Sequence, residues 1–336
     1  MRIEHNYSLI HHNSFHIPAK TRWFAECDNE AELSRILQDN FWRNKGLLSI
    51  GEGSNLLFMN DFDGFILHAC MKEVVVADET SDSVLLRVGA GVHWDDVVAF
   101  AVSKGWGGIE NLSDIPGETG AAAVQNIGAY GVEIKDVIET VEAINQVTGA
   151  KHVFTNESCQ YSYRHSYFKK TDHDPYIITS VFLRLQKKPQ FKLAYGNLIT
   201  QLSGRSITLQ AVRDVVIEVR RSKLPDTTVL GNAGSFFVNP VIAQKQFEDL
   251  TKRFPMIPSY PVSEGYLKVP AAWLIEQCGF KGKREGNVGV YEKQALIIVN
   301  HGGATGGEIC AFANKISHAV HDAFGISLIP EVRYIQ

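Results

Sequence analysis

Two glycine-rich segments carry the residues of this chain best suited to binding a ligand. The first is the turn Gly51-Glu52-Gly53-Ser54-Asn55. Consecutive backbone N–H groups in such a turn form a concave site for an anion, and Ser54 and Asn55 add side-chain donors. A tight hairpin that uses Gly51 and Gly53 for their positive φ explains the same glycines, so the turn alone leaves both interpretations open.

The common nucleotide-binding motifs fit neither this turn nor the next glycine pair. The dinucleotide fingerprint requires a third glycine and a following helix, whereas Leu56 occupies that position here and a strand is predicted after the turn. Gly89-Ala-Gly91 fails in the same way, because Trp94 holds the third position. No Gly-x-x-x-x-Gly-Lys-Ser/Thr sequence occurs. The sequence therefore excludes Rossmann and P-loop sites.

The second segment, Ile115–Gly131, reads Ile-Pro-Gly-Glu-Thr-Gly-Ala-Ala-Ala-Val-Gln-Asn-Ile-Gly-Ala-Tyr-Gly. Gly117, Gly120 and the three alanines that follow let the backbone approach another group closely, while Gln125 and Asn126 offer hydrogen-bonding side chains. A purely structural loop seldom needs so many small residues, and long loops in compact domains are usually functional. The segment therefore favours a ligand site.

Motif spacing gives no indication of a metal site. The histidines form no His-Glu-x-x-His motif, and His11, His12 and His16 favour a solvated arm because no acidic or thiol partner stands at ligand spacing. The cysteines form an odd-numbered set without a Cys-x-x-Cys pair: Cys27, Cys70, Cys159, Cys278 and Cys310. We expect buried reduced thiols, no disulfide and no metal.

Composition points to a soluble chain of more than one domain. It has 336 residues, a net charge of −4, 45% hydrophobic and 21% charged residues, which is ordinary globular composition. The chain has no block of basic residues of the kind that nucleic-acid-binding proteins carry. No apolar run approaches the roughly 20 residues of a membrane span, and we expect no export signal at the start.

Strands and helices are mixed without strict alternation, which predicts α+β domains rather than one doubly wound sheet. Capping boxes at Asn29–Glu32 and Thr305–Glu308 mark two helix starts. Residues 109–131 are expected to be irregular. Helices are expected over 30–39, 94–104, 209–223, 270–279 and 306–324, and strands over 47–50, 56–59, 74–76, 84–88, 137–144, 177–185 and 295–299.

Further short motifs extend the pattern over nearly the whole chain. They are Tyr163-Arg-His-Ser-Tyr-Phe-Lys169, Lys223-Leu-Pro-Asp226, Gly231-Asn-Ala-Gly-Ser-Phe-Phe237, Asn239-Pro240, Ala271-Ala-Trp-Leu-Ile-Glu276 and Pro330-Glu-Val-Arg333. With the two glycine-rich segments, their order and spacing resemble the UDP-N-acetylenolpyruvoylglucosamine reductases, the MurB flavoenzymes of bacterial peptidoglycan synthesis. Tyr195 in Ala194-Tyr-Gly-Asn-Leu198 resembles the tyrosine loop of the type I branch of that family.

The resemblance implies an α+β protein of three domains. Two domains form a vanillyl-alcohol-oxidase-like, PCMH-type unit that binds FAD. The first covers residues 1–70 and 326–336, and the second covers 71–224 with the tyrosine loop near 190–198. The third domain, residues 225–325, binds the substrate.

The resemblance also implies the reaction and its setting. NADPH reduces noncovalently bound FAD, and the reduced flavin passes hydride from N5 to C3 of the enolpyruvyl group of UDP-N-acetylglucosamine enolpyruvate. A protein acid protonates C2, which gives UDP-N-acetylmuramate. The family further implies a cytoplasmic monomer with this small-molecule substrate and with no nucleic-acid or membrane partner.

Three residues match the family's catalytic positions. Negative charge that develops at C2 spreads into the carboxylate, and each preorganised donor there contributes about 3–4 kcal/mol. Arg164 and Glu331 match the family's residues at this carboxylate. The planar guanidinium of arginine suits a carboxylate, and a carboxylate beside the glutamate should raise the pKa of Glu331. Ser235 matches the proton donor and lacks the Gly-x-Ser-x-Gly elbow of an acyl nucleophile. Taken alone, these are a surface arginine, a strand-edge charge and a turn serine.

The remaining matches are binding contacts. The substrate contacts are Tyr195, Lys223, Asn239 and Gln294, of which the lysine and tyrosine suit a diphosphate. Val238 stands where many relatives have lysine; because side chains alternate along a strand, it can face away from the substrate, and only a peripheral charge contact is affected. The flavin contacts are Gly51, Glu52, Gly53, Ser54, Asn55, Leu56, Ile115, Pro116, Gly117, Gly120, Ala121, Gln125, Asn126, Ala129, Tyr130, Gly131 and Arg333.

Two other functions are compatible with a flavin-binding fold. An FAD-dependent alcohol oxidase would react quickly with oxygen and would not need Ser235. A flavin- or nucleotide-binding module without catalysis would have no reason to keep Arg164, Ser235 and Glu331 together.

Overall fold

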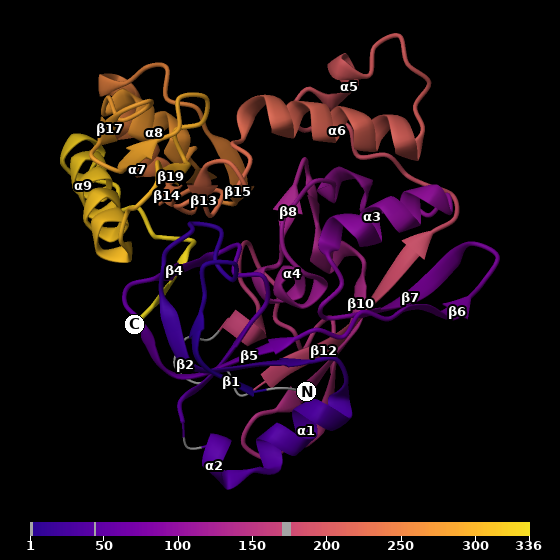
Figure 1. Ribbon diagram of the computed structural model, residues 1–336. Coiled ribbons are helices and arrows are strands. Elements are labelled where there is room, and N and C mark those ends of the chain that lie inside the picture. The colour runs from indigo at the N-terminus through magenta and orange to yellow at the C-terminus, as the bar shows by residue number, and fades with distance from the viewer. Residues whose placement is uncertain (1–2, 44, 170–175) are drawn as a thin grey trace. The chain divides into compact units, whose positions relative to one another are not determined.

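The computed structural model describes residues 3–43, 45–169 and 176–336, and the chain divides into two compact units (Figure 1). Unit 1 comprises Met1–Tyr7, Thr21–Glu52 and Asp63–Ser222. Unit 2 comprises Ser8–Lys20, Gly53–Phe62 and Lys223–Gln336. Among the described helices, none combines the length and the apolar character that crossing a membrane would require.

A four-stranded sheet in the order β1-β2-β5-β3 belongs mainly to unit 1. In sheet order its strands are β1 (Ile3–Ser8), β2 (Lys20–Cys27), β5 (Phe62–Ala69) and β3 (Leu47–Ile50). Two helices, α1 (Glu30–Gln38) and α2 (Asn40–Arg43), connect β2 to β3 in the sequence. The predicted cap of α1 is confirmed, since Asn29 Oδ1 accepts the Glu32 N–H at 2.9 Å. The Glu32 carboxylate accepts from Asp28 rather than from Asn29. Leu33, Ile36 and Leu37 are the buried residues of the helix.

An antiparallel five-stranded sheet forms the larger core of unit 1. The strands predicted over 74–76, 84–88, 137–144 and 177–185 are confirmed, and α3 (Trp94–Ser103) packs its buried residues into the same core. Trp94 is fully buried, and its indole N–H donates to the Leu112 carbonyl at 2.9 Å. In sheet order the strands are β11 (Lys151–Thr155), β10 (Ile138–Asn145), β12 (Tyr176–Gln186), β7 (Ser83–Gly89) and β6 (Val74–Glu79).

The prediction that residues 109–131 are irregular is wrong. The segment contains η1 (Glu110–Leu112), α4 (Thr119–Gln125) and β8 (Gly128–Ala129), which pairs with β9 (Val132–Glu133) before η2 (Ile134–Asp136). Alanine is the strongest helix former, so the alanines after Gly120 support a helix. Gly117, before the helix, and Gly120, within it, hid this signal in the sequence. A Cβ on Gly120 would lie 2.9 Å from the Ala90 Cβ, so part of the small-residue pattern serves close packing within the protein.

The last part of unit 1 is helical. The short η3 (Tyr167–Lys169) precedes β12, and α5 (Leu198–Gln201) and α6 (Leu209–Lys223) end the unit. Buried residues of these two helices form a small core with Leu193 and Leu202, and Tyr130 packs against it. The helix predicted over 209–223 is confirmed.

Unit 2 combines three small sheets with three helices. The predicted helices are confirmed at α8 (Ala271–Gln277) and α9 (Gly306–Phe324), where Thr305 and Glu308 form the capping box and Gly325 ends the helix at φ 64°. The strand predicted over 295–299 is displaced, because its strand pairing starts only at Ile298. The sheets are β13 (Gly231–Asn232), β19 (Ile298–Asn300), β18 (Val288–Val290) and β17 (Arg284–Glu285); β14 (Val241–Ala243), β16 (Tyr266–Lys268) and β15 (Tyr260–Ser263); and β20 (Arg333–Ile335) with β4 (Leu56–Phe58), with α7 (Gln244–Arg253) following β14.

The turn at residues 51–55 is not a hairpin. The strand before it, β3, pairs in parallel with β5, whereas the strand after it, β4, pairs in parallel with β20. The two strands therefore belong to different sheets, and the turn lies where the chain passes from unit 1 to unit 2.

Candidate active site

In unit 1, the corner Gly51–Glu52 lies against the loop that leads into α4. A Cβ on Gly51 would come within 2.8 Å of Glu118 Oε2 and 3.6 Å of the Ala121 Cβ. Burial raises the pKa of Glu52; His93, whose Nε2 lies 3.9 Å from Glu52 Oε2, opposes that rise, and the charge of Glu118 adds to it. Two segments that sequence analysis identified separately therefore meet at one place.

Glu118 is held by a buried histidine. His68 Nε2 lies 2.9 Å from both carboxylate oxygens of Glu118, and both side chains are almost fully buried. Burial opposes a charge on the ring, but hydrogen bonds to Cys70 and Glu118 raise the pKa of His68 to about 10. The ion pair neutralises Glu118 inside the protein.

Arg164 is fixed against the end of α4. Its backbone has φ 55°, and its guanidinium donates to the Gly128 carbonyl at 2.9 Å and to the Asn126 carbonyl at 3.4 Å. Lys169 Nζ donates both to Gln125 Oε1 at 2.8 Å and to the Arg164 carbonyl at 3.1 Å. The arginine matched to a catalytic role is thus tied to residues matched to flavin contacts.

The predicted tyrosine loop lies against the end of the second glycine-rich segment. A Cβ on Gly131 would lie 3.3 Å from the Tyr195 Cβ. Asn111 Nδ2 donates to the Tyr130 carbonyl at 2.9 Å and to the Lys192 carbonyl at 2.7 Å, which joins the two segments. Tyr195 itself is 51% exposed, so its hydroxyl can reach a ligand.

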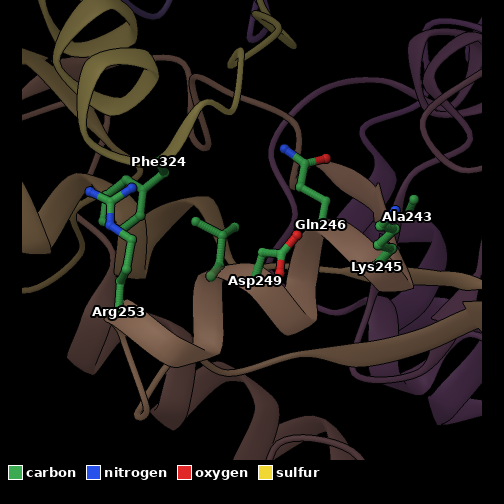
Figure 2. A pocket seen from close by; sticks show the side chains of 7 residues that line it. Ala243, Lys245, Gln246, Asp249, Arg253 and Phe324 are labelled. Atoms are coloured by element: carbon green, nitrogen blue, oxygen red, sulfur yellow. The ribbon is translucent and has the colours of Figure 1, made fainter.

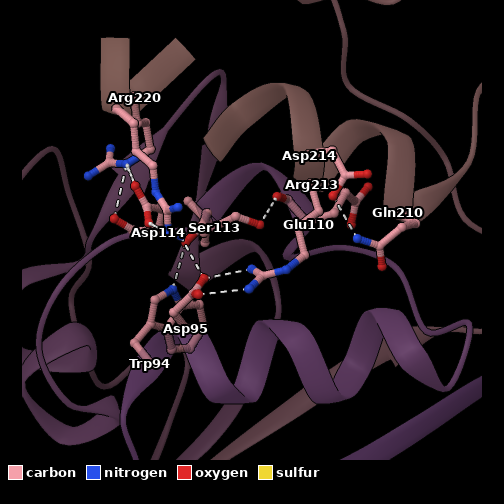
Figure 3. A network of polar contacts seen from close by, with 11 residues as sticks. Trp94, Asp95, Glu110, Ser113, Asp114, Gln210, Arg213, Asp214 and Arg220 are labelled. Atoms are coloured by element: carbon pink, nitrogen blue, oxygen red, sulfur yellow. Dashed lines mark hydrogen bonds and ion pairs between the residues drawn. The ribbon is translucent and has the colours of Figure 1, made fainter. Parts of the chain in front are cut away.

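A polar network fixes the residue that precedes Ile115 (Figure 3). Arg213 on α6 donates two hydrogen bonds to Asp95 on α3, at 2.6 and 2.7 Å, and Asp95 also accepts the Asp114 N–H. Arg220 Nε donates to the Asp114 carbonyl at 3.1 Å. Burial alone would raise the pKa of Asp95, yet its bonds to Arg213 and Asp114 lower it. The network anchors the loop between α3 and α6.

In unit 2, Ser235 and Glu331 lie on neighbouring segments. The Phe236 N–H donates to the Leu296 carbonyl at 2.8 Å, and the Glu331 N–H donates to the Phe236 carbonyl at 2.8 Å. Gly234 has φ 67°, and Ser235 is exposed beside buried Phe236. The serine is therefore presented outward from a fixed backbone.

Two substrate contacts assigned by resemblance to this unit, Gln294 and Asn239, accept hydrogen bonds from backbone N–H groups. Gln294 Oε1 accepts the Leu296 N–H at 3.4 Å. Asn239 Oδ1 accepts the first N–H of α8 at 2.9 Å, which fixes the side chain. Val238 donates its N–H to the Ile329 carbonyl at 2.9 Å, so its backbone continues the pairing of this segment.

The second half of the first glycine-rich turn lies beside the C-terminal strand. Asn55 Nδ2 donates to the Glu331 carbonyl at 3.1 Å, and the Arg333 N–H donates to the Asn55 carbonyl at 3.0 Å. Gly53 has φ 75°, and a Cβ there would overlap the His12 carbonyl. In the described part of the chain, the N–H groups of Gly53, Ser54 and Asn55 find no protein acceptor. Three such consecutive amides suit an anion.

Each unit therefore gathers part of the predicted site. Lys223 is the last residue of α6 and is exposed. Unit 1 holds Arg164, Tyr195 and the flavin matches Gly51, Glu52, Ile115, Pro116, Gly117, Gly120, Ala121, Gln125, Asn126, Ala129, Tyr130 and Gly131; unit 2 holds Ser235, Glu331, Lys223, Asn239, Gln294, Gly53, Ser54, Asn55, Leu56 and Arg333.

A pocket of unit 2 contains none of these residues (Figure 2). It lies along α7 and the end of α9, and its charged lining residues are Lys245, Asp249 and Arg253. The full lining is Ala243, Lys245, Gln246, Asp249, Leu250, Arg253 and Phe324.

Sequence reasoning missed three features of the site. Lys169 is the last residue of the motif Tyr163–Lys169, in which only Arg164 was assigned a role. Its spacing of five residues from Arg164 gave no reason to expect a contact. Asp95 and Arg213 are 118 residues apart, and His68 and Glu118 are 50 apart. Only strand and helix packing brings such pairs together.

Comparison with known proteins accounts for both units. Residues 22–153 match the model of an FAD binding domain, and residues 225–335 match that of the C-terminal domain of UDP-N-acetylenolpyruvoylglucosamine reductase. The chain is 51% identical over 337 residues to the UDP-N-acetylenolpyruvoylglucosamine reductase of Porphyromonas gingivalis strain W83, covering 100% of both chains. It is 45% identical to that of Bacteroides fragilis strain NCTC 9343 (99% of this chain and 100% of the relative) and 41% identical to that of Pseudomonas aeruginosa (98% of each).

The fold agrees with a solved structure. The crystal structure of UDP-N-acetylenolpyruvylglucosamine reductase from Thermus caldophilus superposes with a TM-score of 0.71 over 100% of both chains, at 22% sequence identity. At that identity the likeness concerns the fold alone. The predicted α+β class with an FAD-binding part and a distinct C-terminal part is confirmed.

Proposed function

This chain belongs to the UDP-N-acetylenolpyruvoylglucosamine reductases, and from that premise we propose which of its residues carry the reaction. The protein is an FAD- and NADPH-dependent oxidoreductase, a UDP-N-acetylmuramate dehydrogenase of peptidoglycan precursor synthesis. The single observation that carries the residue assignment is the backbone pairing of Phe236 with Glu331, which places the segments of Ser235 and Glu331 side by side.

The residues present fit FAD. When bound, FAD accepts reducing equivalents from NADPH and delivers them to the enolpyruvyl group. The N–H groups of Gly53, Ser54 and Asn55, which find no acceptor among the described residues, suit its diphosphate. The remaining contacts are proposed at the residues already matched to the flavin, from Ile115 to Gly131 and at Arg333.

Arg164 and Glu331 are proposed to hold the carboxylate of the substrate. Arg164 keeps its guanidinium plane fixed by two backbone carbonyls, at 2.9 and 3.4 Å, and a preorganised cation stabilises developing charge without reorganising. Glu331 is proposed to donate a hydrogen bond to the same carboxylate. Together they would spread the negative charge that forms at C2.

Ser235 is proposed to protonate C2. Its exposed position beside Gly234, with the chain on both sides held by backbone bonds, presents the hydroxyl to a ligand. A serine hydroxyl is a weak acid, so it transfers a proton only to a strongly basic carbon. The carbanion that forms at C2, which binding of the carboxylate stabilises, is such a carbon.

The diphosphate of the substrate is proposed to bind Tyr195 and Lys223, with Asn239 and Gln294 as neutral contacts. Both Tyr195 and Lys223 are exposed and carry donors that suit a phosphate. The half-exposed loop around Tyr195, packed on Gly131, supports assignment to the type I branch with a tyrosine loop.

We further propose a cytoplasmic monomer that acts on UDP-N-acetylglucosamine enolpyruvate. The three domains proposed are residues 1–70 with 326–336, residues 71–224 and residues 225–325. The pairing of β4 with β20 supports joining the C-terminal strand to an N-terminal segment.

Replacement of Ser235 tests the residue assignment. General acid catalysis contributes about 10²–10⁴-fold, so Ser235→Ala should lose that factor in the oxidation of reduced enzyme by substrate. Reduction of the flavin by NADPH should stay within about twofold, because no proton transfer from this serine is involved. A wild-type rate of substrate reduction in Ser235→Ala would remove the serine from the mechanism.

A further inference from the structure

Three side chains with metal-binding atoms converge in unit 1, and none of them is proposed to contact FAD or the substrate. His68 lies on β5 and Cys70 follows directly after that strand, so their spacing of two places them on one face. Glu26 lies on the neighbouring strand β2. A ring nitrogen of His68, the Cys70 Sγ and a carboxylate oxygen of Glu26 lie within 4.8 Å of one another.

The spacing and burial suit a small metal ion. His68 Nδ1 lies 3.3 Å from Glu26 Oε1, and two ligands of a tetrahedral zinc ion at about 2.1 Å each are about 3.4 Å apart. His68 and Cys70 are buried, while Glu26 is largely exposed and gives access from solvent. A thiol, an imidazole and a carboxylate together favour zinc over calcium or magnesium, which prefer oxygen ligands alone.

The other nitrogen of the same ring has the partner that metal-binding histidines usually have. His68 Nε2 lies 2.9 Å from both oxygens of buried Glu118. A carboxylate in this position fixes the tautomer, turns Nδ1 toward the metal and makes the imidazole a better ligand. Glu118 is therefore a positioning residue, not a ligand.

We propose that Glu26, His68 and Cys70 bind one zinc ion, with Glu118 orienting His68 and with a water as fourth ligand. The charges balance, because Zn²⁺ meets the Cys70 thiolate and the Glu26 carboxylate. The neutral imidazole keeps its Nε2 proton, which it donates to Glu118. Binding requires Nδ1 and the thiol to be unprotonated, and it involves no change of oxidation state.

The sequence could not show this site, since its ligands match no metal motif. Glu26 is 42 residues from His68 and becomes its neighbour only because β2 lies beside β5. The spacing His-x-Cys by itself is uninformative.

The test measures zinc in the flavin-loaded enzyme. The protein is incubated with one equivalent of ZnCl₂ and gel-filtered, and its zinc content and X-ray absorption at the zinc edge are measured. We expect one zinc per chain with one sulfur at about 2.3 Å and nitrogen or oxygen ligands at about 2.0–2.1 Å. Cys70→Ser should lose the sulfur signal, whereas Cys278→Ser, a free thiol elsewhere, should keep it.

Two further variants keep the result interpretable if Cys70→Ser folds poorly. Glu26 is more than half exposed, so Glu26→Ala should fold and bind zinc more weakly, whereas exposed Glu157→Ala should bind normally. Glu118→Gln should weaken zinc binding about 10–100-fold. No zinc retained by the wild-type enzyme, or zinc without a sulfur ligand, would overturn the proposal and leave His68 as a buried partner of the two glutamates.

Discussion

Arg213 and Asp95 are joined by two hydrogen bonds of 2.6 and 2.7 Å across 118 residues of sequence. Both side chains are mostly buried, at 12% and 23% exposure. The pair connects α6 to α3, and through the Asp114 N–H it also fixes the start of the second glycine-rich segment (Figure 3). The loop proposed to bind FAD therefore depends on a contact outside it.

The contact predicts a pH dependence of stability. Since the folded protein holds the pKa of Asp95 below its ordinary value, the stabilisation is complete at neutral pH and is lost as pH falls through the acid range below about 4. Asp95→Asn should lower the free energy of unfolding by about 2 kcal/mol at pH 7, because it weakens a charge-assisted bidentate pair, and by less at pH 3. Denaturant unfolding at both pH values measures this.

Asp249→Asn is the matched control, because Asp249 pairs with Lys252 at 2.7 Å on the exposed face of α7. Exposed pairs of this kind contribute little, so that variant should behave as wild type. Equal effects of the two substitutions at pH 7 would contradict the role given to Asp95.

Lys169 should matter to catalysis although we expect it to touch no substrate. Its Nζ joins the Gln125 side chain to the backbone of Arg164, at 2.8 and 3.1 Å. Lys169→Met should lower kcat about 10–100-fold with a smaller change in KM, since a small displacement of a positioned group has effects of that size.

The control for this prediction is Lys188→Met, whose side chain is 84% exposed in its pair with Asp82. Steady-state kinetics should leave that variant unchanged, and Lys169→Arg should recover part of the lost kcat. An unchanged kcat in Lys169→Met would show that Arg164 does not need this support.

Tyr195 should be separable from the chemistry. Tyr195→Phe removes one hydroxyl from a half-exposed side chain, and loss of a hydrogen bond to a charged group corresponds to roughly a tenfold rise in the substrate KM. Flavin reduction by NADPH should change less. Tyr7→Phe on β1 is the control, and an unchanged KM in Tyr195→Phe would exclude the tyrosine as a diphosphate contact.

Gly53 should tolerate no side chain. Its φ of 75° disfavours other residues, and a Cβ would overlap the His12 carbonyl. Gly265 has φ 76° with nothing within 4 Å, so Gly265→Ala reports the cost of φ alone, about 1–2 kcal/mol. Gly53→Ala should be more destabilising and should lose bound FAD. Equal thermal stability and FAD content of the two variants would contradict the close contact of Gly53 with the His12 carbonyl.

Local patterns predicted most of the secondary structure. The capping box of Thr305 and Glu308 and the end of that helix at Gly325 could be predicted, because each signal consists of residues at the helix end itself. Helix α4 was missed because Gly117 and Gly120 outweighed the alanines, and the helix is supported by packing of Gly120 against Ala90. Because Gly120 and Ala90 are far apart in the sequence, no local pattern indicates their contact.

The site was predictable only as far as motifs reach. The glycine-rich segments were found as ligand candidates from residue types alone, and roles for Arg164, Ser235 and Glu331 came from resemblance. The residues that hold them, such as Lys169 and the pair of Asp95 with Arg213, form no motif. Their partners are set by how strands and helices pack.

The most direct test of the central claim is anaerobic absorbance of the purified flavoprotein during two successive additions. NADPH is added first and UDP-N-acetylglucosamine enolpyruvate second. The account predicts that the flavin bands bleach with NADPH and return with the substrate, without oxygen. Bands that stay bleached until air enters would contradict the substrate assignment, and a protein that shows no flavin bands after incubation with FAD would contradict the account altogether.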